Sequence, residues 1–368
     1  MRIRVKNRSI SIFASLLSMP YSQLFFVDDN SNWSLSWDVR EIIKIAEKLE
    51  IDANTSSNYG VIGQSIFYAS KYILLQPKFY LLFSSFKSNV AFSYFHGYPD
   101  SGEATALACY NNLKKYHRHI SKIQVSHSKM RNFVLDTGIN PKKVFTIPIG
   151  INPDFFYVQT KQSKVNARKK LGIPQSAVVI GSFQKDGVGV NEGTEPKLIK
   201  GPDIFLKTLR ILKDKIPDLF ILLSGPARGY IKNGLNQLKI PYKHIYLDYY
   251  PDICDLYQCI DLYIVSSREE GGPKAVLESM ISGIPLVTTC VGQAMDLVDH
   301  EVNAMMVNVE DAEALAHYSH RVLMDSTLSQ KLVDNGLITA RLNTYSTQTN
   351  LWDNFFHEFV KKFNDTKI

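Results

Sequence analysis

The second half of the chain alternates short β-prone runs with helical patterns, and this rhythm limits the possible folds more than any other feature. The β-prone runs are residues 178–183, 219–223, 245–247, 262–265 and 285–289. The first four are followed by helical patterns over residues 202–212, 230–238, 253–259 and 273–281. Strands that alternate with helices form parallel sheets covered by helices on both faces. We therefore predict a doubly wound α/β domain here.

The first half shows a looser form of the same rhythm. Strands are predicted over residues 24–28, 90–95, 123–126 and 144–148, and helices over 38–49 and 103–117. A polar, Lys-rich connection over 152–166 marks a domain boundary. The predicted parts are residues 1–160, 161–345 and a terminal helix within 346–368. That helix, over 346–363, has an apolar stripe that must pack on another element: Leu351, Phe355, Phe359 and Phe363.

The length of 368 residues and a hydrophobic content of 45% fit two cored domains. No apolar run reaches the roughly 18–20 residues that cross a bilayer. The first 23 residues imitate a secretory signal, but serines dilute their apolar part, and we expect a mature, cytoplasmic N-terminus. Four cysteines without paired spacing indicate a reducing compartment.

The positive charge is concentrated in the first half. Residues 1–165 hold 20 Lys and Arg against 11 Asp and Glu, a balance of +9, whereas the remainder holds 22 against 24. This asymmetry suggests an anionic partner, either nucleic acid or anionic lipid. An ordinary solvated surface gives the same count, so charge alone does not choose.

The stretch REEGGPKAVLE, residues 268–278, follows the strand at 262–265 and therefore lies at the carboxyl edge of the sheet, where open α/β folds bind ligands. Gly271 and Gly272 allow a ligand to approach the backbone, and Pro273 suits the first helical position. The N–H groups of Lys274 and Ala275 then point out of the helix start, which favours an anion such as phosphate.

Two carboxylates flank this loop. Glu270 precedes the helix and Glu278 lies about a turn and a half inside it, so both are predicted to face one crevice. Carboxylates accept hydrogen bonds from paired hydroxyls, which sugars and ribose rings offer. Two solvated surface charges explain the spacing equally well.

Cations for an anionic ligand follow the first strand of the second domain. Lys185 and Lys200 bracket a Gly-rich excursion at the same sheet edge. Within it, Gly187 and Gly189 imitate a dinucleotide fingerprint, but Gly193 stands one position too late, and we reject a nicotinamide cofactor.

Further candidates also follow strands. The Ser224-Gly225-Pro226 turn with Arg228 forms either part of a nucleotide pocket or a simple strand-to-helix turn, and the turn is favoured. His96 is placed at the interdomain edge of the first sheet as a substrate-binding or structural imidazole, and His127 is a weaker candidate. Trp33 and Trp37 line an acceptor pocket or cap a helix. Aspartate pairs separated by one residue do not occur, so metal-independent chemistry is expected.

The motifs together resemble the retaining glycosyltransferases of family 4, whose GT-B architecture has two Rossmann-like domains facing a central cleft. The signature is a Glu, seven residues and a second Glu, here Glu270 and Glu278 within SSREEGGPKAVLESMISGIPLVTT, followed by GQAMDLVDHEVNAMMV. The resemblance covers most of residues 141–320. It implies that the C-terminal helix packs back on the first domain.

The resemblance also implies roles for single residues. Glu270 contacts the donor sugar, Glu278 the ribose hydroxyls, and the backbone of residues 271–275 the sugar and phosphates. Lys200 matches the diphosphate-binding lysine. The family's arginine is absent: Ser182 stands in that segment, and Lys185 is the nearest cation. Ser182 and Gly225 complete the expected donor site, and His96 the catalytic set.

The function that the resemblance implies is transfer of a sugar, with retention, from a nucleotide diphosphate sugar to a saccharide or lipid-linked acceptor in cell-surface polysaccharide or glycolipid synthesis. No cofactor, metal or nucleic-acid partner is expected. The basic first domain is expected to dock on the inner face of the membrane. The alternatives are a GT-B sugar-nucleotide epimerase or hydrolase, and a non-catalytic nucleotide-sugar or membrane-binding protein.

Overall fold

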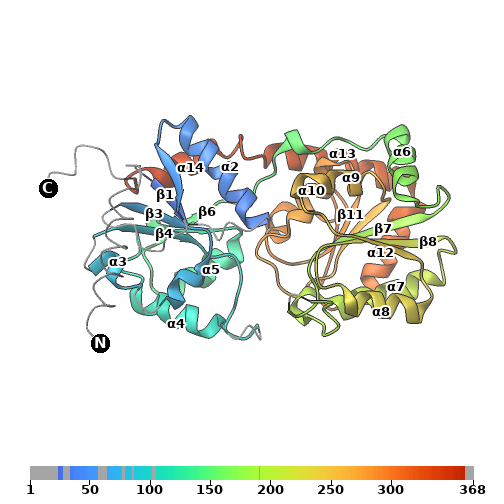
Figure 1. The fold of residues 1–368 in the computed structure, drawn as a ribbon, viewed down its shortest axis with the longest axis horizontal. Helices are drawn as coiled ribbons and strands as arrows, with labels where there is room; N and C mark the ends of the chain where they lie inside the picture. Colours follow the sequence, from blue (N-terminus) through green and yellow to red (C-terminus); the bar gives the residue numbers. More distant parts are fainter. Residues whose placement is uncertain are drawn as a thin grey trace, which may run out of the picture.

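The computed structural model describes residues 24–27, 34–56, 64–76, 79–84, 87–101, 105–189 and 191–360. They form two α/β domains that lie side by side (Figure 1). Each domain contains a six-stranded, wholly parallel sheet with helices packed against it. The two-domain α/β fold predicted from the alternating pattern is therefore confirmed.

The first sheet has the strand order β2-β1-β3-β4-β5-β6. Its strands are β1 (Leu24–Val27), β2 (Ala53–Ser56), β3 (Ser65–Tyr68), β4 (Asn89–Ser93), β5 (Lys122–Val125) and β6 (Val144–Thr146). The helices of this domain are α2 (Ser34–Lys48), α3 (Leu81–Ser84), α4 (Ala106–Tyr116) and α5 (Ser128–Leu135). β1, at the second position, has four buried residues and is covered on both faces.

The second sheet has the order β12-β11-β10-β7-β8-β9. Its strands are β7 (Val178–Phe183), β8 (Leu219–Ser224), β9 (Tyr242–Ile245), β10 (Leu262–Val265), β11 (Leu286–Thr289) and β12 (Met305–Val307). The helices are α6 (Lys161–Leu171), α7 (Pro202–Lys213), α8 (Gly229–Leu238), α9 (Ile253–Tyr257), α10 (Lys274–Ile281), α11 (Ala294–Leu297), α12 (Ala312–Met324) and α13 (Ser326–Leu342). The order reverses beside β7 and β10, and a ligand-binding crevice is expected at their carboxyl ends.

Two local predictions were wrong. The strand predicted over 245–247 is β9, three residues earlier, because Lys243 and His244 hide the apolar alternation in this half-buried edge strand. Pro273 precedes the first helical residue instead of occupying it, since its ψ of 107° is extended. The polar strand β2 was missed for the same reason as β9.

The C-terminal segment returns to the first domain through α14 (Thr349–Phe356) (Figure 1). Its buried side chains join the core around β1 and α2: Trp352, Phe355, Phe356 and Phe359. Ser65 Oγ and Asn89 Nδ2 donate hydrogen bonds of 2.8 and 2.7 Å to the Phe359 carbonyl. The predicted packing of this segment on the first domain is confirmed.

The predicted apolar stripe of that helix needs a correction. Leu351 is 42% exposed, and Trp352 takes the buried position one residue later. The buried set follows the spacing i, i+3, i+4, i+7 that a 3.6-residue period requires, whereas a strict spacing of four rotates off the face. The helix predicted over 346–363 is also too long, since α14 ends at Phe356 and residues 357–360 are not helical. Phe363 lies outside the described residues.

None of the helices in the described part of the chain is long and apolar enough to cross a membrane. Residues 1–23, which imitate a secretory signal, lie outside that part.

Candidate active site

An ion pair lies at the carboxyl edge of the second sheet, where the loops after β7 and β10 meet. Lys200 Nζ lies 2.6 Å from Glu270 Oε2, and Ser267 Oγ donates a hydrogen bond of 2.7 Å to Glu270 Oε1. The two charged side chains are 24% and 11% exposed. Both oxygens of the carboxylate thus have partners, while the ammonium group retains access to solvent. The structure brings together the two residues that the sequence placed at one site.

Gly201 explains why the lysine can approach this loop. It has φ +62° and precedes α7, and a Cβ atom there would lie 1.9 Å from the carbonyl oxygen of Ser266. Ser266 Oγ in turn donates a 3.0 Å hydrogen bond to the Gly201 carbonyl. Any side chain at this position would push the loop after β10 away from Lys200, so the Lys-Gly sequence fixes the ion pair.

The loop that carries Glu270 also contacts the first domain. The Gly97 N–H donates a 2.5 Å hydrogen bond to Glu269 Oε1, and Ser126 Oγ donates one of 2.5 Å to the Gly271 carbonyl. A Cβ on Gly271 would lie 2.4 Å from the Cβ of Phe95, which requires glycine there. His96 lies between Phe95 and Gly97 in sequence. It therefore belongs to the loop that faces the predicted donor loop. Its carbonyl accepts a 2.6 Å hydrogen bond from Lys71 Nζ.

The Gly272 backbone is packed as closely as that of Gly271. A Cβ there would lie 2.7 Å from Ile149 and 3.0 Å from the Oε1 atom of Gln293. The same Gln293 oxygen accepts a 2.8 Å hydrogen bond from the Ile149 N–H. The glycine pair therefore seats the loop against the first domain, in addition to any role with a ligand.

Glu278 lies deeper than its partner in the motif. It is 3% exposed and accepts hydrogen bonds from Tyr250 Oη at 2.5 Å and Tyr257 Oη at 2.9 Å. Burial raises the pKa of Glu278, and the tyrosine hydroxyls and Lys274 oppose that rise. Burial and the nearby carboxylate raise the pKa of both tyrosines well above 10. Sequence reasoning missed these tyrosines: Tyr250 belongs to the aromatic run before α9, and Tyr257 is the last residue of that helix.

Lys274 and Ala275 open α10, as the sequence predicted for backbone donors to an anion. The Lys274 side chain does not point to Glu270. It forms an ion pair with Asp38 of α2 in the first domain, and its ammonium lies 5.0 Å from the centre of the Tyr250 ring. The helix start is thus tied to the first domain by a charged side chain.

Arg228 does not line an open site. It is 1% exposed, donates hydrogen bonds of 2.7 Å to the carbonyls of Ser182 and Ser224, and pairs with Asp186 at 3.0 Å. It also donates one of 3.0 Å to Ser182 Oγ. Ser182 is correspondingly buried beneath the arginine. These contacts clamp the ends of β7 and β8 and support the interpretation of a structural turn.

The turn around Gly225 is held in the same way. Gly225 has φ +91°, and a Cβ would lie 2.8 Å from the Gln184 carbonyl oxygen. Its own carbonyl is 2.8 Å from His244 Nε2. Lys185, the proposed replacement for the family arginine, is half-buried in the neighbouring loop.

Trp37 lies inside the first turns of α2 and caps no helix. Its ring packs against Tyr249 and Tyr250 of the second domain and against Phe155 of the connection, with ring centroids 5.2 to 6.0 Å apart. The Arg40 guanidinium covers it at 4.5 Å. Trp37 is therefore an interdomain packing residue beside the Glu278 tyrosines. Trp33 lies outside the described residues.

His127 caps α5. The Met130 N–H donates a 3.3 Å hydrogen bond to His127 Nδ1, and the ring is 1% exposed. Burial lowers the pKa of His127 to about 4 from an ordinary value of 6.5. The ring is consequently a neutral acceptor, and the geometry gives it a structural role.

This burial predicts a pH effect on stability. Below pH 6.5 the His127 ring is protonated in the unfolded chain but stays neutral in the folded protein. The stability contributed by His127 is therefore present above pH 6.5 and is lost as the pH falls toward 4. His127→Asn keeps a capping oxygen without a titrating ring. Between pH 7 and 5 we expect the unfolding free energy of the wild type to fall by about 2 kcal/mol more than that of the variant. Urea unfolding measures this, with exposed His317→Asn as control. Equal losses in wild type and His127→Asn would refute the prediction.

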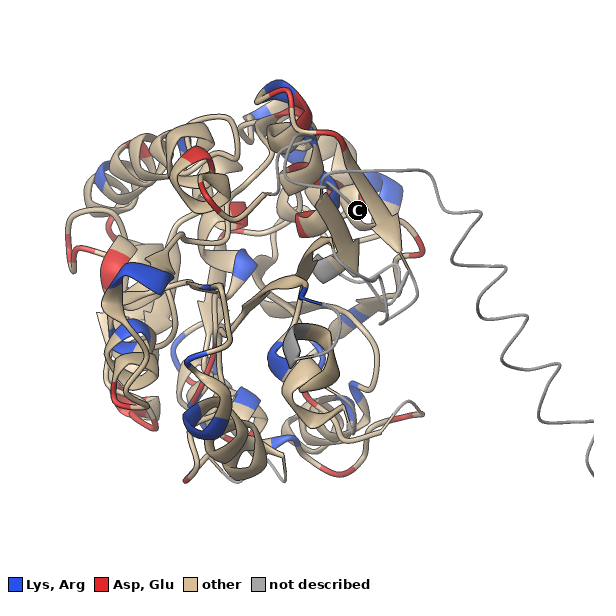
Figure 2. Cartoon of the chain, turned by 90° about the vertical axis from the view of Figure 1, so that its left-hand side faces the viewer, with Lys and Arg blue, Asp and Glu red and all other residues tan. Residues whose placement is uncertain are grey.

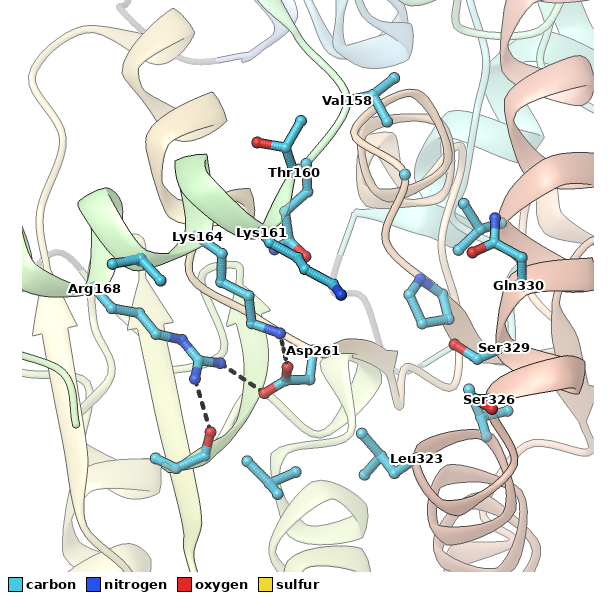
Figure 3. Close-up of a pocket in the computed structure, with 18 of the residues that line it drawn as sticks. Val158, Thr160, Lys161, Lys164, Arg168, Asp261, Leu323, Ser326, Ser329 and Gln330 are labelled. Atoms are coloured by element: carbon cyan, nitrogen blue, oxygen red, sulfur yellow. Dashed lines mark hydrogen bonds and ion pairs between the residues drawn. The ribbon is translucent and has the colours of Figure 1, made fainter. Parts of the chain in front are cut away.

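A cavity of about 830 Å³ lies at the opposite edge of the second sheet, between α6 and α13 (Figure 3). Its lining includes Val178, Asp261 and Pro285, at the amino ends of β7, β10 and β11. On its α6 wall, Lys164 and Arg168 both pair with Asp261. The cavity is thus separated from the Lys200–Glu270 pair by the length of the strands, and two of its cations share the single carboxylate of Asp261.

Figure 2 shows the protein from the side of the first domain, with basic positions spread over several elements and mixed with acidic ones. Four of the 20 basic residues of positions 1–165 fall within residues 1–23, outside the described residues. In the part of the chain that the structure describes, no group of three or more His, Cys, Asp or Glu is arranged to hold a metal ion.

Residues 195–338, less than half of the chain, match the family model described as Glycosyl transferases group 1. The matched region lies in the second domain, contains Lys200, Glu270 and Glu278, and ends within α13.

Curated relatives are similar to part of this chain. An uncharacterised glycosyltransferase of Methanocaldococcus jannaschii is 28% identical over 225 residues, which are 60% of this chain and 54% of that protein. The lipopolysaccharide core biosynthesis mannosyltransferase LpsB of Rhizobium meliloti is 24% identical over 189 residues, 49% of this chain and 51% of LpsB. The chain spans about half the length of the curated relatives it matches.

The similarity in fold extends over both domains. The structure of Anabaena HepE in complex with UDP-glucose superposes with a TM-score of 0.73 at 17% identity, and covers 92% of this chain and 100% of the HepE chain. The predicted GT-B fold is confirmed.

Proposed function

We propose that the protein is a retaining glycosyltransferase that moves a sugar from a nucleotide diphosphate sugar to a saccharide or lipid-linked acceptor. The observation that carries the proposal is the Lys200–Glu270 pair, held at the carboxyl edge of a group 1 domain between the starts of α7 and α10. The complex of the similar HepE with UDP-glucose supports the donor class. The mannosyltransferase relative supports a hexose.

The chemistry follows from the charges at this edge. When the bond between sugar and diphosphate breaks, negative charge develops on the leaving phosphate. In this proposal, Lys200 and the N–H groups that open α10 would stabilise that charge, with Lys185 as the second cation. A donor of this kind would bring its sugar to Glu270 and its ribose to Glu278. His96, on the facing loop of the first domain, would contact the sugar.

Retention in this proposal involves no enzyme nucleophile. Glu270 is the carboxylate proposed to contact the donor sugar, but its two oxygens are engaged by Lys200 and Ser267. A carboxylate in this environment orients and stabilises, and it makes a poor nucleophile. The acceptor would therefore attack from the face that the diphosphate leaves, with the donor phosphate accepting the proton.

The test is donor binding followed by product analysis. UDP-, GDP- and ADP-sugars are screened for a rise in melting temperature, since a ligand that binds the folded state stabilises it by mass action. The stabilising donor is then incubated with and without saccharide and lipid-linked acceptors. We expect transfer that requires an acceptor and keeps the anomeric configuration. An epimer or free sugar formed without acceptor would favour the epimerase or hydrolase, and binding without turnover a non-catalytic protein.

The proposed reaction needs no metal, because protein cations neutralise the diphosphate. We therefore expect the transfer rate in excess EDTA to stay within about twofold of the rate with Mg²⁺, whereas metal-dependent sites lose several kcal/mol of transition-state stabilisation. Loss of turnover in EDTA that Mg²⁺ or Mn²⁺ restores would contradict this.

The acceptor would be bound by residues 1–160, the donor by residues 161–345, with residues 346–368 joining the two. The +9 balance of positions 1–165 supports docking of this half on the inner, anionic face of a membrane. Flotation with liposomes that contain anionic lipid should decrease with salt. Flotation independent of lipid charge would reject membrane docking and leave a free saccharide as the acceptor.

A further inference from the structure

Lys274 and Glu278 stand four positions apart on α10, yet they are not partners. A lysine and a glutamate at this spacing lie on the same helix face and readily form an ion pair. Among the described residues, Lys274 pairs instead with Asp38, which is 236 positions away in the first domain. Glu278 is held by the hydroxyls of Tyr250 and Tyr257. The first domain thus competes with Glu278 for the ammonium group.

Asp38 is built to hold that ammonium. It is 7% exposed on α2, and the Tyr345 hydroxyl donates a 2.5 Å hydrogen bond to the same oxygen that Lys274 contacts. Burial raises the pKa of Asp38, and Lys274 opposes the rise more strongly than any other neighbour. A buried carboxylate without its cation is costly, so the pair has a strong reason to persist.

Without the charge of Asp38, the nearest other carboxylate on the helix is Glu278. Lys274 already acts on it electrostatically, since it is the main group that lowers the pKa of Glu278. An ammonium on Glu278 would occupy an acceptor position that the ribose hydroxyls need, because Tyr250 and Tyr257 already take one position on each carboxylate oxygen.

We propose that Asp38 is a positioning residue of the donor site: by holding the Lys274 ammonium against the first domain, it keeps Glu278 available to the ribose hydroxyls of the donor. This inference rests on the proposed function. It also links the two domains, because ribose recognition in the second depends on a carboxylate from the first. The hydrogen bond from Tyr250 to Glu278 is weaker than a buried ion pair with Lys274 would be. Ribose hydroxyls can therefore replace the tyrosine hydroxyl on this carboxylate.

The experiment compares nucleotides with and without the ribose hydroxyls. Calorimetry gives the Kd of UDP and of 2′,3′-dideoxyuridine 5′-diphosphate for the full chain, with ADP and GDP and their dideoxy forms in parallel. The ratio of the two Kd values isolates the ribose contacts, since changes in phosphate binding affect both nucleotides. We expect the dideoxy nucleotide to have a Kd about 10 times that of UDP or more in the wild type, because it lacks the ribose hydroxyls that donate hydrogen bonds to the Glu278 carboxylate.

Asp38→Asn keeps the shape and the acceptor for Tyr345 but removes the charge. We expect its Kd ratio to fall about tenfold toward 1, through weaker UDP binding. The double variant Asp38→Asn, Lys274→Met removes the competing ammonium and should restore the ratio. Glu41→Gln is the matched control, because it removes another buried acid of α2 that pairs with Lys44. Its ratio should equal that of the wild type.

The outcomes separate the two levels of the proposal. If the wild type binds none of the diphosphates, the proposed function fails, and this inference with it. If it binds them with a ratio near 1, the role of Asp38 and the Glu278–ribose contact are both refuted, while the proposed sugar transfer stands. If Asp38→Asn keeps the wild-type ratio, only the role of Asp38 is refuted. A low Kd ratio in both the single and the double variant would show that Asp38 is a purely structural residue. Unchanged melting temperatures verify that the variants are folded.

Discussion

Lys200→Met should lower the rate of sugar transfer by about 10²–10³-fold, the usual effect of removing one preorganised group that stabilises charge in a transition state. The substitution keeps the length of the side chain and deletes its charge. It also leaves Glu270, with an 11% exposed side chain, facing the donor phosphates without its cation. Repulsion from that carboxylate adds to the loss. Initial rates with saturating acceptor measure the effect, and Lys213→Met, an exposed lysine of α7, is the control.

Glu270→Gln provides a second measurement of the same pair. Because Lys200 and Glu270 act as one unit, the double variant should be about as slow as the slower single variant, rather than showing the product of both losses. Both variants should unfold at temperatures close to the wild type, since the pair is partly open to solvent. Turnover near the wild-type level in Lys200→Met would refute the assignment of the donor site.

Arg228→Met should lower the free energy of unfolding by about 3–5 kcal/mol, the usual consequence of removing one partner of a buried ion pair. Asp186 would remain buried without its cation, and the carbonyls of Ser182 and Ser224 would lose their donor. Burial already raises the pKa of Asp186, and Arg228 is the main group that opposes the rise. Without the arginine the carboxyl should bind a proton at still higher pH.

This gives the second prediction a pH dependence with a definite sign. A carboxyl whose folded pKa is raised contributes most stability when protonated, and that stability is lost as the pH rises through the folded pKa. Arg228→Met should therefore be more destabilised at pH 8 than at pH 5. Adding Asp186→Asn should recover part of the loss at pH 8, as urea unfolding would detect. Equal destabilisation at both pH values would show that Asp186 is not the cause.

Much of the fold and part of the site were predictable because they depend on short-range patterns. The alternation of strands and helices over residues 178–289 gave five strands, of which β7 and β10 begin and end at the predicted residues. The carboxyl ends of parallel strands meet at one edge, so the loops of Lys200 and Glu270 had to be neighbours. The polar edge strands β2 and β9 were missed or misplaced, because edge strands bury too little to need an apolar pattern. The edge strand β12 and the buried interior strand β3 were also missed, as runs of only three and four residues.

The sequence by itself determined that two α/β domains with parallel sheets form. It also determined that a lysine, a glutamate and a helix start share the carboxyl edge of the second sheet. Only the tertiary structure decided which charges pair. Lys274 faces an equally suitable Glu278 four positions away, but it binds Asp38 from the other domain. Arg228 stands in a loop where the sequence favours a structural turn but also allows a ligand-binding arginine, and it is buried with Asp186. Local spacing shows which partners a charge can reach, whereas burial and domain packing determine which of them it keeps.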